Sequence, residues 1–177
     1  MPDYRRVWHP GGTYFFTVNL LRRGGNRLLI LHIEHLRSVV AQVRKAHPFR
    51  IHAWVVLPDH LHAIIELPEG DVDYATRWRL IKMGFSKGIP NDEYRTRIRE
   101  RRGERGIWQR RYWEHLIRDE QDYRAHRDYV HINPLKHGLV ERVADWPYST
   151  FHRLVENGIY PEDWADAGNA DRLSYVD

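Results

Sequence analysis

The order of strand-like and helix-like stretches along this sequence of 177 residues agrees with an α+β fold. Two observations carry this prediction. Short runs rich in β-branched and aromatic residues have the length of strands, and they are interleaved with stretches whose apolar residues have helical spacing. A chain of this length can also bury about 70% of its unfolded surface, which is enough for one core. We therefore expect one domain over residues 1–155 and a C-terminal tail over residues 156–177.

The first strand is expected over residues 13–21, where aromatic and β-branched side chains gather. A helix over residues 33–46 follows from apolar side chains at helical spacing (Leu36, Val39, Val40 and Val43). It ends at His47 because the residue before a proline avoids the α region. The basic loop at residues 22–26 between them fits either a solvated connector or a phosphate contact.

A hairpin over residues 50–67 organises the chain, and its two apolar runs flank Pro58. The break falls there because proline cannot sit inside a central strand. His60 and His62 open the second run, and residues two apart on a strand point to the same face. This pattern presents two imidazoles side by side, as a divalent metal site requires. The alternative is two ordinary histidines at a strand end, since a chain with 12 histidines contains about one such spacing by chance.

A second helix is expected over residues 74–87, where Trp78, Ile81 and Phe85 form an apolar stripe. Its basic face fits either solvent or a phosphate backbone. Residues 89–107 are dense in charge and poor in apolar side chains, which predicts an insertion loop or a short exposed helix. A short strand fits residues 112–117. We expect a turn anchored by aromatic side chains at residues 145–152.

The third long helix is expected to begin after the N-cap Asp119 and to stop at Pro134. Tyr129 and Asn133 are four residues apart and share one helix face. Tyrosine offers a nucleophilic Oη, and asparagine offers an oxygen ligand for a hard cation. The alternative is that Tyr129 packs in the core and Asn133 caps the helix. Pro134 also leaves open whether Asn133 is helical.

The composition favours a nucleic-acid partner. The formal net charge is +4, the positive side chains are mostly arginine, and there are seven Trp and ten Tyr. Arginine forks bind phosphates and base edges, and aromatic rings provide stacking surfaces. The stretch Trp108-Gln109-Arg110-Arg111 combines these groups, although a loop anchored by a core Trp108 fits it as well. An arginine-rich surface over an aromatic core would give the same composition.

Several classes of protein are excluded or disfavoured. There is no cysteine, so neither disulfides nor thiolate metal sites form. No stretch approaches the ~20 apolar residues of a membrane span, and the N-terminal residues lack the apolar segment of a signal peptide. No glycine-rich phosphate loop and no G-x-S-x-G motif occur. We expect a soluble cytoplasmic protein with no membrane partner, associated with the nucleoid when bound to DNA.

Motifs along nearly the whole chain resemble the REP-associated tyrosine transposases, a group of single-tyrosine HUH transposases. The resemblance is carried by Tyr4-Arg5-Arg6, Gly11-Gly12-Thr13-Tyr14-Phe15-Phe16-Thr17-Val18-Asn19, Trp54-Val55-Val56-Leu57-Pro58-Asp59-His60-Leu61-His62, Trp108-Gln109-Arg110-Arg111-Tyr112-Trp113-Glu114-His115, Asp128-Tyr129-Val130-His131-Ile132-Asn133-Pro134-Leu135-Lys136-His137-Gly138 and Trp146-Pro147-Tyr148-Ser149-Thr150. It is weakest over residues 89–107 and the final dozen residues. Any one of these motifs is unspecific, whereas their combination is specific.

The resemblance implies an antiparallel sheet flanked by helices, close to a ferredoxin-like arrangement. It implies that His60 and His62 are the metal ligands of the HUH motif, that Asn133 is a third ligand, and that Tyr129 is the nucleophile. The expected cofactor is Mg²⁺ or Mn²⁺. The expected activity is cleavage and rejoining of single-stranded DNA beside hairpins of repetitive extragenic palindromes (REP) through a 5′-phosphotyrosine, by a monomer or a homodimer.

Charge and position add candidate DNA contacts to this picture. They are Arg5, Arg6, Arg77, Arg110 and Arg111, and Trp108 and Gln109 join them as a stacking ring and an amide fork. Two alternatives stay open for the function. One is an HUH nickase of plasmid replication or conjugation, and the other is a DNA-binding module that has the fold without the catalysis.

Overall fold

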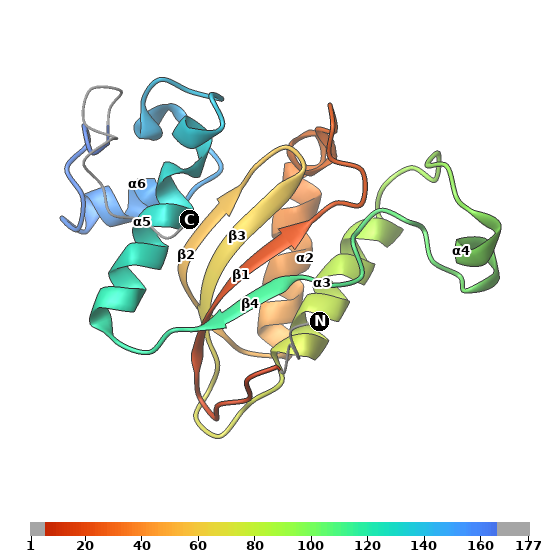
Figure 1. Cartoon of the computed structure of the whole chain (residues 1–177), viewed down its shortest axis with the longest axis horizontal. Coiled ribbons are helices and arrows are strands. Elements are labelled where there is room, and N and C mark those ends of the chain that lie inside the picture. The colour runs from red at the N-terminus through yellow and green to blue at the C-terminus, as the bar shows by residue number, and fades with distance from the viewer. Residues whose placement is uncertain (1–5, 166–177) are drawn as a thin grey trace, which may run out of the picture.

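A four-stranded antiparallel sheet forms the centre of the computed structural model, which describes residues 6–165 (Figure 1). In spatial order the strands are β2 (Arg50–Val56), β3 (His60–Glu66), β1 (Thr13–Asn19) and β4 (Trp113–Leu116). β2 and β3 are the expected hairpin, and the backbone N–H of Leu57 donates to the His60 carbonyl at 2.9 Å across its turn. The prediction of an α+β fold with an antiparallel sheet is confirmed.

One face of the sheet packs against helices α2 (Ile33–Ala46) and α3 (Tyr74–Lys87), whose bounds agree with the sequence prediction. β1 alternates as a strand should, so Tyr14, Phe16 and Val18 point into this layer and are fully buried. They meet the apolar stripes of both helices. This layer holds the larger part of the core, and its central members from the helices are Leu36, Val39, Val43, Trp78, Ile81 and Phe85.

The opposite face is covered by α5 (Glu120–Lys136), which lies over β2 and β3 (Figure 1). Asp119 caps this helix as predicted, because its carboxylate accepts the N–H of Asp122 at 2.8 Å. A smaller apolar cluster joins sheet and helix here, and its buried members are Phe15, Ala53, Val55, Leu57, Ile64, Val130 and Trp146. The same face also carries polar residues, namely Thr17 and Asn19 of β1 and His60 and His62 of β3.

The helix α5 does not stop at Pro134, so that prediction is wrong. It continues to Lys136 with Pro134 inside it. A proline at this position removes the hydrogen bond to the Val130 carbonyl. Burial of the Pro134 ring offsets that loss. Asn133 is consequently helical, and its side chain lies on the same face as Tyr129 one turn earlier.

Three short helices complete the described chain. α1 (Leu28–Leu31) precedes α2, α4 (Arg97–Arg101) lies at the tip of an extension formed by residues 89–107, and α6 (Phe151–Glu156) follows a 3-10 turn at Val143–Asp145 (Figure 1). α6 was not predicted, and its first two residues fall in the stretch that was expected to form a turn. No helix within residues 6–165 is both long enough and apolar enough to cross a membrane.

A third apolar cluster, formed by Ile132, Val143, Phe151, Tyr160 and Ala165, encloses the imidazole of His131. His131 is fully buried between Thr150 Oγ1 at 2.9 Å and Tyr160 Oη at 3.3 Å. Burial, reinforced by the charge of Arg127, lowers the pKa of His131 to about 3. The ring is therefore neutral in the folded protein at ordinary pH.

This histidine should make the protein sensitive to acid. The unfolded chain takes up the proton near pH 6.5 but the folded chain only near pH 3, so stability is complete above pH 6.5 and falls as pH drops below it. At 1.36 kcal/mol per pKa unit, we expect a loss of roughly 2 kcal/mol between pH 7 and pH 5. Urea unfolding at the two pH values measures it. His131→Gln should reduce the loss, and an equal loss in both proteins would contradict the assignment.

Candidate functional site

The two histidines of β3 lie on the face of the sheet that α5 covers. Strand periodicity puts His60 and His62 on one side, and the register pairs them with Asn19 and Thr17 of β1. Both rings are buried, and they meet edge to face with centroids 5.0 Å apart. The side-by-side presentation predicted from the spacing is thus present beneath a helix.

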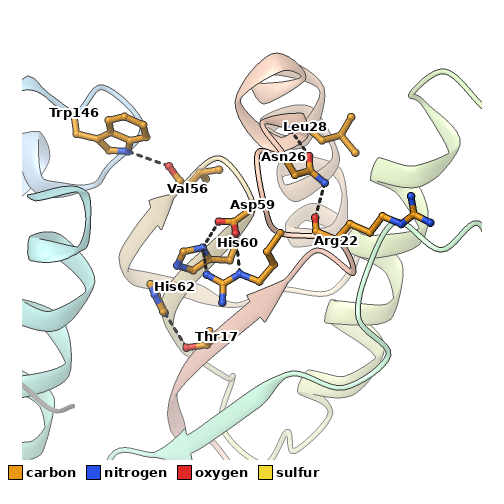
Figure 2. Close-up of polar contacts among 10 residues, drawn as sticks. Thr17, Arg22, Asn26, Leu28, Val56, Asp59, His60, His62 and Trp146 are labelled. Atoms are coloured by element: carbon orange, nitrogen blue, oxygen red, sulfur yellow. Dashed lines mark hydrogen bonds and ion pairs between the residues drawn. The ribbon is translucent and has the colours of Figure 1, made fainter. Parts of the chain in front are cut away.

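His62 has one engaged ring nitrogen and one without a partner. Its Nδ1 lies 2.8 Å from Thr17 Oγ1 (Figure 2), while its buried Nε2 has no hydrogen-bond partner among the described residues. Burial holds the pKa of His62 well below its usual value, the rings of His60 and His137 add to this, and Asn133 acts in the opposite direction. When Nδ1–H donates to Thr17, Nε2 carries a lone pair that can bind a cation.

His60 is held by a carboxylate. Its Nδ1 lies 2.6 Å from Asp59 Oδ1, and the other oxygen of Asp59 accepts from Arg23 Nε at 2.8 Å (Figure 2). Burial lowers the pKa of His60, and Asp59 opposes that shift. A carboxylate on the far nitrogen fixes the tautomer and orientation of a metal-binding imidazole. Asp59 therefore fixes the orientation of the His60 ring, as a metal-binding imidazole would need.

α5 brings the predicted tyrosine and asparagine to these histidines. The Tyr129 ring contacts His62 and Phe15 edge on, with centroids 5.2 Å and 5.8 Å away. Asn133 is fully buried, and its Nδ2 donates to the Tyr129 carbonyl at 2.6 Å. Its Oδ1 accepts no hydrogen bond from the described residues. The structure thus brings together all four residues that were predicted for catalysis and metal binding.

Three buried polar atoms without a hydrogen-bond partner lie close together at this site, whereas others in the described structure, such as those of Trp78 and Tyr112, lie on the opposite face of the sheet. Besides His62 Nε2 and Asn133 Oδ1, the side-chain oxygen of Asn19, which stands opposite His60, is buried without a partner in the described structure. Each such atom costs roughly 1–3 kcal/mol unless something binds it. Imidazole nitrogens and amide oxygens together suit Mn²⁺ or Mg²⁺. The residues present therefore fit the expected divalent cation.

Three residues near this site were not singled out from the sequence. Asn19 could have been found only from the strand register. Lys136 places its Nζ 5.2 Å from the centroid of the Tyr129 ring, and His137 stacks edge on against His60 at 5.1 Å. Lys136 follows Tyr129 by two helical turns, and this relation was hidden because the helix was expected to end at Pro134.

A second polar cluster lies between β4 and α5, and the Phe15 ring, which contacts both His62 and His126, separates it from the first site. Ligand atoms of His115, Asp122 and His126 lie within 4.8 Å of one another, and Phe15 packs on His126. The Asp122 carboxylate lies 2.9 Å from His115 Nε2 and accepts the N–H of Arg118 at 2.9 Å. His126 Nδ1 lies 2.9 Å from the Asp122 carbonyl. These contacts give the polar groups of the cluster hydrogen-bond partners, and they join β4 to the start of α5.

Two predicted DNA contacts are contradicted by burial. The Arg77 guanidinium is buried and donates to Asp71 Oδ2 and to the carbonyls of Asp73 and Pro48 at 2.6–2.7 Å. Trp108 is buried against Phe85, and its Nε1 donates to the Lys82 carbonyl at 3.1 Å. Neither side chain is available to DNA, because each is buried and its polar group donates hydrogen bonds within the protein.

Arg77 should instead matter for stability. Replacing it by methionine in Arg77→Met leaves Asp71 and two carbonyls unpaired, and we expect a loss of roughly 2–4 kcal/mol, moderated because Asp71 is partly exposed. The exposed neighbour Arg79 supplies the control Arg79→Met, which should change stability little. Urea unfolding compares the two. A fully stable Arg77→Met protein that has lost DNA binding would contradict this role.

The other candidate DNA contacts have varied surroundings. Arg5 lies outside the described residues. Arg6 lies 3.4 Å from Glu114 and over the Tyr112 ring. Gln109 donates its backbone N–H to the Asn19 carbonyl at 3.0 Å. The segment that bears Arg110 and Arg111 therefore begins next to Asn19, at the edge of the site. Both arginines are exposed, and Arg110 pairs with Glu104 at 3.1 Å.

Comparison with known proteins adds independent information. A protein of Escherichia coli (strain K12) named REP-associated tyrosine transposase is 50% identical over 165 residues, and the match covers 93% of this chain and 92% of that protein. A Haemophilus influenzae protein is 46% identical over 97% of this chain and 96% of its own length. A solved structure of the REP-associated tyrosine transposase bound to a REP hairpin superposes with a TM-score of 0.80 at 49% identity, covering 94% and 93% of the two chains. No protein-family model matches the chain.

Proposed function

This chain belongs to the REP-associated tyrosine transposases, and we propose that it cleaves and rejoins single-stranded DNA beside REP-type hairpins through a 5′-phosphotyrosine. The observation that carries the proposal is the meeting of Tyr129 with His60, His62 and Asn133 around unpartnered buried polar atoms. A core without a ligand would leave these atoms at a net cost. The relative bound to a REP hairpin supports hairpin DNA as the substrate.

The metal ligands of this proposal are His60, His62 and Asn133, with the Asn19 oxygen as a further donor. A bound Mg²⁺ or Mn²⁺ supplies Lewis-acid polarisation of the scissile phosphate. Asp59 orients the first imidazole and Thr17 the second, so both ring nitrogens are prepared before DNA arrives. The low pKa values of both histidines keep the rings neutral, as ligation requires.

Tyr129 is the nucleophile. Its ring packs edge-on against Phe15 and His62, which limits the positions that Oη can take. Oη attacks phosphorus in line, the bond from phosphorus to the 3′ oxygen breaks, and a proton is taken up by the departing 3′ oxygen. Lys136, over the ring, favours the negative charge that develops as the phenol loses its proton. The phosphodiester energy stays in the tyrosine link, so a 3′-OH can reverse the step and join strands.

A denaturing gel tests this proposal. Labelled single-stranded DNA with a REP-type hairpin is incubated with the full chain and Mn²⁺, with and without EDTA. We expect a protein–DNA adduct that requires the metal, and religation when a strand with a free 3′-OH is added. Adduct formation without hairpin preference or joining would point to a nickase. Binding without any cleavage would point to a DNA-binding module and overturn the proposal.

A further inference from the structure

A cavity of about 540 Å³ opens beside His60, between the loop that follows β1 and the end of α5. Asp59 and His60 form one wall, residues 23–27 form a second, and His137, Leu139 and Trp146 form a third. Figure 2 shows Asp59 and His60 with Trp146 on one side of the view and Asn26 on the other. Its volume falls within the roughly 300–1,000 Å³ of small-molecule sites.

The walls of this cavity divide by chemistry. Leu139 and Trp146 supply apolar surface, and the Trp146 ring is fixed because Nε1 donates to the Val56 carbonyl at 2.9 Å (Figure 2). Arg23 and Arg27 also line the cavity, supply positive charge, and are exposed. Apolar surface and guanidinium groups in one cavity suit a flat base linked to an anionic phosphate.

The cationic wall is prepared in advance. Asn26 accepts the N–H of Leu28 at 2.9 Å and donates to the Arg22 carbonyl at 2.8 Å, which fixes the turn (Figure 2). The N–H of Leu29 donates to the Pro58 carbonyl at 3.2 Å, and Arg23 pairs with Asp59. These bonds join the loop to the hairpin turn next to His60. The backbone of the loop is therefore fixed, and the Arg23 side chain is held by Asp59.

We propose that this cavity receives one nucleotide of the DNA strand next to the scissile phosphate, and this inference rests on the proposed function. The base lies against Leu139 and Trp146, while Arg23 and Arg27 contact its phosphate. Because His60 forms part of the same wall, filling the cavity places the neighbouring phosphodiester at the histidines and Tyr129. The cavity thus sets the cleavage position relative to the strand.

The test uses DNA binding by the full chain carrying Tyr129→Phe, without metal, so it does not depend on turnover. A single abasic site is moved along the hairpin oligonucleotide, and affinity is measured by fluorescence anisotropy. We expect one position, adjacent to the bond cleaved by the unmodified protein, at which base removal weakens binding about tenfold. The same position carrying 2-aminopurine should change its fluorescence on binding.

A cavity-filling variant makes the assignment specific. Leu139 is 39% exposed, so Leu139→Trp should fold while occupying the base position. It should weaken binding of intact DNA about tenfold and bind DNA that is abasic at that position nearly as well as the parent does. Arg27→Ala should weaken both DNAs alike. Arg22→Ala is the matched control, because the Arg22 guanidinium lies over Tyr94 at 5.3 Å and does not line the cavity.

Two failures can be told apart. If abasic sites act equally at all positions, or Leu139→Trp binds intact DNA as the parent does, the nucleotide site is overturned whether or not cleavage occurs. If the unmodified protein forms no tyrosine adduct, the proposed function fails even when the abasic scan identifies a single position. That position must adjoin the cleaved bond, and a single position elsewhere on the oligonucleotide overturns the inference.

Discussion

Tyr129→Phe should abolish the covalent protein–DNA adduct, with adduct formation reduced roughly a thousandfold or more, because the phenyl ring has no Oη to attack phosphorus. The ring itself is retained, so the edge contacts with Phe15 and His62 persist and the fold should be unaffected. DNA affinity should change little. Adduct yield on a denaturing gel and anisotropy with the same hairpin DNA measure the two quantities.

Tyr123→Phe provides the matched control on the same helix. Tyr123 is half-buried at the start of α5, where its ring meets His52 and not the two histidines of β3. Its variant should form the adduct at the parental rate. Cleavage that survives Tyr129→Phe would mean that activated water attacks the phosphate, and the phosphotyrosine mechanism would then be wrong.

Removal of a histidine should have the second largest effect. His62→Ala removes the unpartnered Nε2. We expect Mn²⁺ affinity to fall by more than about a hundredfold, because loss of a residue that only orients a ligand typically costs 10–100-fold. Adduct formation should fall with it. Mn²⁺ titration by calorimetry measures binding directly and needs no DNA.

Two further variants keep this result interpretable. His52→Ala removes a histidine of the same hairpin that pairs with Glu66 at 2.6 Å, outside the site, and should leave Mn²⁺ affinity unchanged. His60→Ala should reproduce the loss seen with His62→Ala. If all three variants bind Mn²⁺ as the parent does while thermal unfolding shows them folded, the metal ligands lie elsewhere, and the His115–Asp122–His126 cluster becomes the next place to examine.

The sequence predicted those parts of the fold that local patterns determine. Helices over residues 33–46 and 74–87 have strong apolar stripes and clear ends, and the structure has them at those bounds. The hairpin follows from two apolar runs around Pro58. Period-two alternation placed His60 and His62 on one face, and helical spacing placed Tyr129 beside Asn133.

Features set by tertiary contacts were missed. Arg77 has the spacing of an exposed basic face, but Asp71 and the Pro48 carbonyl, both outside its helix, draw it into the interior. The sequence around Trp108 fits both a stacking ring and a core ring, and only the tertiary contact with Phe85 decides between them. Asn19 gained its place only through pairing with β3. Pro134 is buried within α5, and the helix continues past it despite the local tendency of proline to end a helix.

Mass spectrometry of peptides from the purified protein–DNA adduct, after digestion of protein and DNA, identifies the nucleophilic residue directly. We expect the peptide containing Tyr129 to carry a nucleotide joined through its 5′-phosphate to Oη, with the other strand ending in a free 3′-OH. Full cleavage with an unmodified Tyr129 peptide, or the nucleotide on another tyrosine, would contradict this expectation.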